Sequence, residues 1–416
     1  MTEFDSIKDP IIRIYALDLL KHFRSALSYG YAVVLDDARK SLNRSQRVPA
    51  QIQRRGREKN YEIAQLYRAF HAIEPATPDK ELEVLSRILG ELNTISDFFL
   101  STRSYFTRYT NIDERLANYQ ADIASLDKEM ETLRSAVNGS EDAKKEIYHS
   151  VMRERFDQLD APYLFEIVDF VIELTNPPPF DNPPNATEGL AALVKQAHEL
   201  AKTLTQTNVD RRFVSAIHDY IDALTEEHFS PIKIDLISNR LRFHLVEMRD
   251  EIPGFAIAEV SALLLSQERV LRQFPMWRAF EAEASKFDPN EEITTKQTEL
   301  LSQVASETRN STGIASDRVI EAFDRLIETN DDISSNKTAE FGVWRSVENF
   351  LKTNIRHVIN AAKSIQKNAT QHQIKYMTYI ERLLPAAKLY ASMDSSKAWL
   401  LPVILWIEDT IKQLKR

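Results

Sequence analysis

The 416-residue sequence predicts an all-α protein: a multi-helix bundle with a long antiparallel coiled-coil-like helical hairpin and little or no β-sheet. Glycine is scarce, with 8 residues or about 2% against a usual ~7%, and sheet-rich folds use glycine in their turns. No segment combines sustained apolar–polar alternation with flanking hairpin-turn residues. Apolar residues instead recur at helical spacing, as they do between Leu190 and Leu204.

A proline-rich segment divides the chain. Five prolines lie within residues 177–184, which excludes a helix there and favours a stiff, extended link. We therefore expect an N-terminal helical region at 1–174, a linker at 175–188 and a C-terminal helical bundle at 189–416. Pairs of a capping residue and a nearby proline predict further helix starts. These pairs are Thr77-Pro78, Asp160 with Pro162, Ser230-Pro231 and Asp288-Pro289.

The hairpin is expected at about 100–160. Apolar residues from position 109 onward are spaced alternately by three and four, the heptad repeat of a left-handed coiled coil. The seam comprises Leu116, Tyr119, Ile123, Leu126, Met130, Leu133 and Val137. Asn138-Gly139-Ser140 then signals a turn, and Ser140 is placed to cap a helix over roughly 141–160. We expect this hairpin to lie within a bundle, with a free two-chain coiled coil as the alternative.

Catalytic motifs that depend on closely spaced glycines or on cysteine are excluded. No two glycines lie within twenty residues of each other, which removes the P-loop, the dinucleotide fingerprint and the nucleophile elbow. The absence of cysteine removes thiolate metal sites and thiol nucleophiles. His218, Asp222 and Glu226 share one predicted helix face, but a solvated polar face explains them more simply than a metal site. We expect no cofactor, metal or evident small-molecule substrate, although acid–base catalysis by residues distant in sequence stays open.

Residues 39–59 form a basic segment. It holds eight basic residues and one acidic residue: Arg39, Lys40, Arg44, Arg47, Arg54, Arg55, Arg57 and Lys59, with Glu58. Pro49 and Gly56 disfavour a continuous helix, so we expect part of the segment to be an exposed loop. Its cations are candidate contacts for phosphate groups or for an acidic protein partner. No aromatic residues are interleaved with them, so base stacking is not indicated.

A second basic feature lies on a helix expected over 341–368. Lys352, Arg356, Lys363 and Lys367 fall within a stripe of about 60° on its surface. Residues 1–150 carry a net charge of −1, residues 151–350 of −15 and residues 351–416 of +7. The stripe is therefore a candidate for a phosphate backbone or for docking on the acidic middle region.

Membrane insertion has weak support in the sequence. Arg13 and Asp18 interrupt the first apolar stretch, so no secretory signal is indicated and a cytoplasmic protein is expected. No window reaches the ~18 uncharged apolar residues of a spanning helix. The segments 255–265 and 398–407 are the most apolar, and we expect the latter to dock into the protein.

These patterns together predict a non-enzymatic helical scaffold, adaptor or accessory subunit of a multiprotein complex. It would act through helix-mediated protein–protein contacts, with a protein partner, a homo-oligomer or both. The first alternative is a nucleic-acid-associated subunit that binds the phosphate backbone through segment 39–59 and stripe 352–367. The second is a helical membrane-active protein of the pore-forming type.

Overall fold

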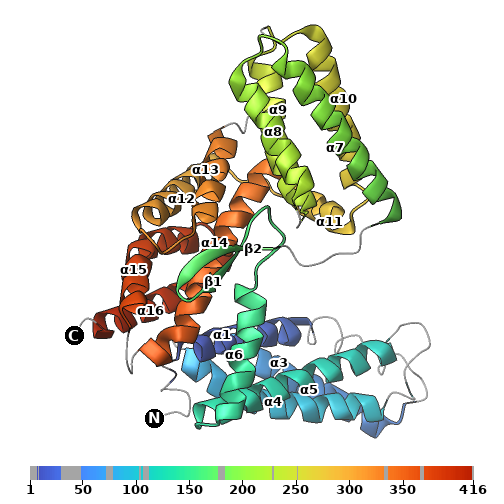
Figure 1. The fold of residues 1–416 in the computed structure, drawn as a ribbon. Coiled ribbons are helices and arrows are strands. Elements are labelled where there is room, and N and C mark those ends of the chain that lie inside the picture. The colour runs from blue at the N-terminus through green and yellow to red at the C-terminus, as the bar shows by residue number, and fades with distance from the viewer. Residues whose placement is uncertain are drawn as a thin grey trace. The chain divides into compact units, whose positions relative to one another are not determined.

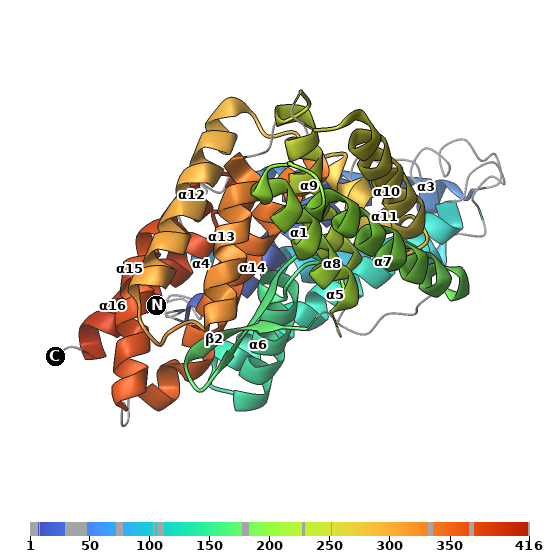
Figure 2. The same ribbon diagram turned by 45° about the horizontal axis from the view of Figure 1, so that its top comes forward.

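A computed structural model shows an all-α protein in which the described residues form one small two-stranded sheet besides the helices (Figures 1 and 2). It describes residues 7, 9–29, 48–71, 78–102, 105, 112–176, 183–226, 229–250, 252–331, 336–365 and 370–414. The chain falls into two compact units, Met1–Glu154 and Arg155–Arg416. The predicted fold class is confirmed.

In the first unit, the regular secondary structure of the described residues is entirely helical. Its helices are α1 (Pro10–Tyr29), α3 (Ala50–His71), α4 (Pro78–Ser101), α5 (Ile112–Val137) and most of α6 (Glu141–Phe156). Helix α5 packs against α1 and α4, and α3 packs against α4. The first six seam residues of α5 are buried in this packing, while Val137 is only partly buried. The seam is therefore part of a bundle core, and a coiled-coil hairpin of α5 with α6 is not confirmed.

The turn after α5 follows the prediction. Gly139 has a φ of 98°, a left-handed conformation that suits glycine. The Ser140 hydroxyl accepts a hydrogen bond of 3.3 Å from the Ala143 N–H and so caps α6. The N-terminal boundary of the hairpin differs, because α4 ends at Ser101 and α5 begins only at Ile112.

The expected break in the basic segment occurs at Pro49 but not at Gly56. Helix α3 runs without interruption from Ala50 through Gly56 to His71. Pro49 lies just before the helix, and its carbonyl accepts hydrogen bonds from the N–H groups of Ile52 and Gln53. A proline at a helix start costs nothing, and an interior glycine costs only about 1 kcal/mol relative to alanine.

The second unit contains two groups of helices. The first group is α7 (Pro184–Thr205), α8 (Arg211–Thr225), α9 (Pro231–Glu247), α10 (Gly254–Leu271) and α11 (Pro275–Ala284). The second is α12 (Glu291–Asn310), α13 (Asp317–Asp331), α14 (Lys337–Ile365), α15 (Gln371–Ser392), the 3₁₀ helix η3 (Ser395–Lys397) and α16 (Leu400–Leu414). Helices α7 to α10 lie side by side as a bundle (Figure 1). Their core continues to Phe341 of α14, which joins the two groups.

Of the three helix starts predicted within this unit, one holds and two do not. Ser230 caps α9 ahead of Pro231, as expected. Helix α12 is capped by Asn290 rather than Asp288, because the Asn290 side chain accepts from the Ile293 N–H at 2.9 Å. Residues 160–162 begin no helix and lead into a strand instead. Helix α7 begins at Pro184, so residues 184–188 of the predicted linker are helical.

A β-hairpin was not anticipated from the sequence. Strand β1 (Leu164–Val168) pairs antiparallel with β2 (Val171–Thr175). The two turn residues, Asp169 and Phe170, have φ values of 51° and 65°. Such left-handed turns usually carry Asn-Gly, so Asp-Phe gives no recognisable signal. The Phe170 ring packs edge-on against His357 and Tyr376, which holds this unfavourable backbone in place.

Hydrogen bonds and aromatic packing hold the hairpin against the second group of helices. Ile172 of β2 donates to the Ile314 carbonyl at 2.7 Å and accepts from the Ser316 N–H at 3.0 Å. The Phe165 ring of β1 packs on Phe323 and Phe350. The hairpin therefore holds a fixed position within this unit.

The apolar C-terminal segment docks into its own unit. Val403, Ile404 and Ile407 of α16 are fully buried, and the helix packs on α15 and α14. Leu401 and Leu405 remain exposed on the opposite side. Within the part of the chain that is described, no helix is both long and apolar enough to cross a membrane.

Candidate functional site

The described part of the basic segment lies on α3. Arg39, Lys40, Arg44 and Arg47 lie outside the described residues. Arg54, Arg55 and Arg57 are exposed in the first turns of α3, and Arg54 pairs with Glu58 at 3.0 Å. Lys59 is less exposed and pairs with Glu62 at 2.7 Å. The exposed arginines add their charge to the positive end of the helix dipole.

Half of the basic stripe lies on described parts of α14. Lys352 Nζ is 2.9 Å from Glu348 Oε1, and Arg356 Nη1 is 2.7 Å from Asp157 Oδ1. The Lys363 side chain and Lys367 lie outside the described residues. The two described cations are thus already neutralised by carboxylates of the same unit.

The Lys352–Glu348 pair belongs to a buried charged cluster. Its side chains are only 11% and 10% exposed. The Tyr390 hydroxyl donates to Glu348 Oε1 at 2.9 Å, and Arg345 lies 3.7 Å away. The Lys397 ammonium lies 4.3 Å from the Trp344 ring centroid and approaches the same cluster. Burial raises the pKa of Glu348, but Lys352, Lys397 and Arg345 outweigh it, so the pKa lies below its ordinary value.

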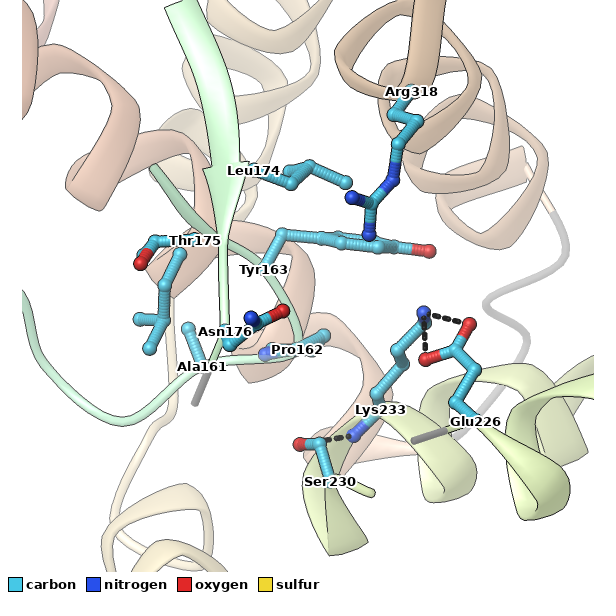
Figure 3. Close-up of a pocket in the computed structure, with 11 residues that line it drawn as sticks. Ala161, Pro162, Tyr163, Leu174, Thr175, Asn176, Glu226, Ser230, Lys233 and Arg318 are labelled. Atoms are coloured by element: carbon cyan, nitrogen blue, oxygen red, sulfur yellow. Dashed lines mark hydrogen bonds and ion pairs between the residues drawn. The ribbon is translucent and has the colours of Figure 1, made fainter. Parts of the chain in front are cut away.

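A cavity of about 380 Å³ opens beside the β-hairpin (Figure 3). It is formed by the residues before β1, the end of β2, the end of α8 and the starts of α9 and α13. Its lining comprises Ala161, Pro162, Tyr163, Leu164, Leu174, Thr175, Asn176, Glu226, Ser230, Lys233 and Arg318. All of these elements belong to the second unit.

Close backbone packing positions one wall of this cavity. A Cβ atom at Gly342 would lie 3.0 Å from Pro162 Cγ, so glycine lets α14 approach the segment before β1. The Tyr163 N–H donates to the Ser346 hydroxyl oxygen at 3.3 Å. Burial raises the pKa of Tyr163 to about 12, and the neighbouring Arg325 opposes the rise. The Tyr163 phenol is therefore neutral and its ring forms a fixed wall.

A lysine–glutamate pair lies on the opposite wall. Lys233 Nζ is 2.5 and 2.6 Å from the two carboxylate oxygens of Glu226. The side chain of Lys233 is 13% exposed and that of Glu226 is 37% exposed. Burial lowers the pKa of Lys233, and Glu226 only partly offsets this effect. The Lys233 ammonium also lies 5.8 Å from the centroid of the Tyr163 ring.

Arg318 supplies a second cation to the cavity. It lies in the first turn of α13 and is exposed, and no carboxylate of the described residues pairs with it. Figure 3 shows its guanidinium directed toward Tyr163, on the side of the ring away from Pro162. Its charge lowers the pKa of Lys233 further, as does that of Arg325. Two cations and one carboxylate therefore line the cavity.

Helix α10 carries an exposed apolar stripe on its surface. Phe255, Ala258, Ala262 and Leu265 are exposed and are spaced by three, four and three residues. The other face of the helix is buried in the bundle core through Ala256, Val260, Leu263 and their neighbours. The apolar segment 255–265 is thus a helix with one buried and one exposed apolar face, and we call the latter the α10 stripe.

Sequence reasoning missed the cavity because its residues come from four separate parts of the chain. Glu226 stood out only as a member of a metal constellation, whereas the structure pairs it with Lys233. The described residues hold no group of three or more His, Cys, Asp or Glu side chains placed to bind a metal ion. The chain matches no known protein family, no curated protein and no solved structure.

Proposed function

We propose that the protein is a non-enzymatic helical scaffold or accessory subunit that acts through helix-to-helix contacts. The observation that supports this proposal is the exposed α10 stripe. Exposed apolar side chains gathered on one surface mark interaction sites on soluble proteins. The alternation of three and four residues is the spacing with which one helix packs its side chains between those of another.

The stripe fits a second copy of this chain. In an antiparallel pair of α10 helices, Phe255 of one copy lies opposite Leu265 of the other, and Ala258 lies opposite Ala262. The spacing reads the same in both directions, so the stripe complements itself about a two-fold axis. The alanines at the centre allow close approach, and the larger residues pack on either side of the crossing point.

The charges at the two ends of the stripe support the same pairing. Residues 249–251 carry one net negative charge, and residues 268–272 carry one net positive charge. An antiparallel arrangement brings opposite ends together and also opposes the helix dipoles. The stripe is small compared with the ~800 Å² per partner of a standard interface, so we expect weak, concentration-dependent self-association.

Sedimentation equilibrium of the full chain from about 1 to 200 µM tests this, because a weak dimer dissociates within that micromolar range. Leu265→Glu should abolish association, because it places a charge at the apolar contact. Ile374→Glu is the matched control, since Ile374 of α15 is 56% exposed and Leu265 is 57% exposed. A protein that stays monomeric throughout, or a dimer that survives Leu265→Glu, would overturn the proposal.

The N-terminal end of α3 favours a second candidate function, binding to a nucleic-acid backbone. Arg54, Arg55 and Arg57 are exposed there beside the positive end of the helix dipole. Fluorescence anisotropy with labelled duplex and single strands tests it. Binding through several phosphate contacts should weaken by orders of magnitude between about 50 and 200 mM salt, and less steeply once the three arginines are alanine. No binding at the lower salt concentration would contradict this function.

A further inference from the structure

We propose that the cavity beside the β-hairpin binds a small organic monocarboxylate whose apolar body packs against Tyr163 and Leu174. This site is independent of the α10 stripe and of self-association. It adds a small-molecule ligand to a protein whose sequence indicates none. Four observations carry the inference: the cavity itself, its net charge, the free guanidinium of Arg318 and the apolar wall.

The charge of the cavity selects for a single negative charge. Glu226 binds Lys233 through both carboxylate oxygens, so this pair is neutral as a whole. Arg318 is left with one positive charge and no carboxylate partner in the described residues. A monoanion balances that charge, whereas a phosphate dianion would leave an excess negative charge near Glu226.

The donors of the cavity fit a carboxylate. The Arg318 guanidinium presents a planar fork that binds the two carboxylate oxygens through parallel hydrogen bonds. The Ser230 hydroxyl oxygen accepts from the Lys233 N–H at 3.3 Å, which leaves the hydroxyl proton free to be donated. The side-chain amide of Asn176 lines the same cavity. Arg318 is therefore the charged donor for a bound carboxylate, and the neutral donors Ser230 and Asn176 line the same cavity on the other side of the Tyr163 ring (Figure 3).

The remaining lining fits an apolar body. Tyr163 presents its ring beside Leu174, Pro162 and Ala161 (Figure 3). The volume of about 380 Å³ is at the lower end of the range of small-molecule sites. A ligand the size of benzoate fits this volume, with its ring against Tyr163 and its carboxylate toward Arg318. Aromatic rings that pack in this way gain more than their buried area alone provides.

Binding of sodium benzoate to the full-length protein tests the inference. Thermal unfolding and isothermal titration are followed up to about 20 mM ligand at constant ionic strength, because so small a ligand is expected to bind with millimolar affinity. Sodium acetate tests the contribution of the apolar wall, and sodium phosphate tests the preference for a monoanion. We expect saturable binding of benzoate and much weaker binding of acetate and phosphate.

Three variants sharpen the test. Arg318→Gln should weaken benzoate binding about tenfold or more, because it removes the charged fork. Arg382→Gln is the matched control, since Arg382 is an exposed arginine of α15 outside the cavity, and it should bind as the wild type does. Glu226→Gln adds one positive charge to the cavity and should raise the affinity for phosphate relative to benzoate.

Three results would overturn the inference: no saturable benzoate binding, benzoate binding unaffected by Arg318→Gln, or phosphate binding as tightly as benzoate to the wild-type protein. Circular dichroism of each variant establishes that it is folded. Because Arg318 is exposed and makes no hydrogen bond or ion pair among the described residues, its replacement should leave the fold intact.

Discussion

Two lysine–glutamate pairs of the second unit share the same chemistry but have different surroundings. Lys352 and Glu348 lie on one helix, and both are almost fully buried. Tyr390, Arg345 and the neighbouring Lys397 complete the environment of that carboxylate. Lys233 and Glu226 come from two different helices and line an open cavity, with the unpaired Arg318 nearby.

The difference shows which of the two pairs stabilises the fold. In the α14 cluster, surrounding cations lower the pKa of Glu348 despite its burial, so the folded state favours the charged form. At the cavity, burial lowers the pKa of Lys233 despite its bond to Glu226, so the folded state disfavours that charge. The first pair supports folding, and the second is held at a cost to folding.

The largest expected effect follows from removing the buried carboxylate. Glu348→Ala should lower the free energy of unfolding by about 3–5 kcal/mol, because it leaves Lys352 without its carboxylate partner in a buried site. Glu226→Ala should cost about 1 kcal/mol or less, because that carboxylate is partly exposed to solvent. Urea unfolding measures both free energies. Equal losses of stability in the two variants would contradict the claim that only the Lys352–Glu348 pair stabilises the fold.

The pH dependence of stability should follow from the same carboxylate. The folded-state pKa of Glu348 is below its ordinary value of 4.5, so its stabilising effect is present above pH 4.5 and is lost as the pH falls through the folded-state pKa. The groups that face it are Arg345, Lys352, Lys397 and Tyr390. Glu348→Gln should therefore flatten the acid limb of the stability curve. An unchanged acid limb would contradict this assignment.

Replacement of two arginines, one paired and one unpaired, should show a similar contrast with smaller changes in stability. Arg345 is paired with Glu283 at 2.8 Å and lies over the Phe341 ring, so Arg345→Gln should cost about 1–2 kcal/mol. Arg318→Gln should change stability by less than about 0.5 kcal/mol, because its side chain is exposed and unpaired among the described residues. Chemical unfolding of both variants at neutral pH checks the contrast. A large loss from Arg318→Gln would show that this arginine is structural.

Much of the fold could be predicted, because local sequence patterns such as apolar periodicity and capping residues indicate helices. Periodic apolar residues predicted α7, and the Ser230-Pro231 pair predicted the start of α9. The β-hairpin could not be predicted, because Asp169 and Phe170 adopt a turn that tertiary contacts with His357 and Tyr376 stabilise. Helix α3 continues through Gly56, where packing and hydrogen bonding outweigh a weak local preference.

The cavity could not be predicted from the sequence for a different reason. Tyr163, Glu226, Lys233 and Arg318 belong to separate elements, and no spacing in the chain connects them. Lys352 lies four residues after Glu348 on one helix, a spacing that allows this pair, but the burial of the pair depends on the tertiary fold. Residue spacing predicts the face of a helix, whereas the partners of that face depend on the tertiary fold.

Replacement of each lysine by methionine tests the contrast between the pairs most directly. The free energies of unfolding of Lys233→Met and Lys352→Met are measured side by side in urea, without added ligand. Lys352→Met should lose several kcal/mol, about 3 or more, because Glu348 loses its closest cation in a buried site. Lys233→Met should be as stable as the wild type or more so, because the buried charge is removed and Glu226 can turn to water. Equal, large losses in both variants would contradict the account and make the cavity pair a structural one.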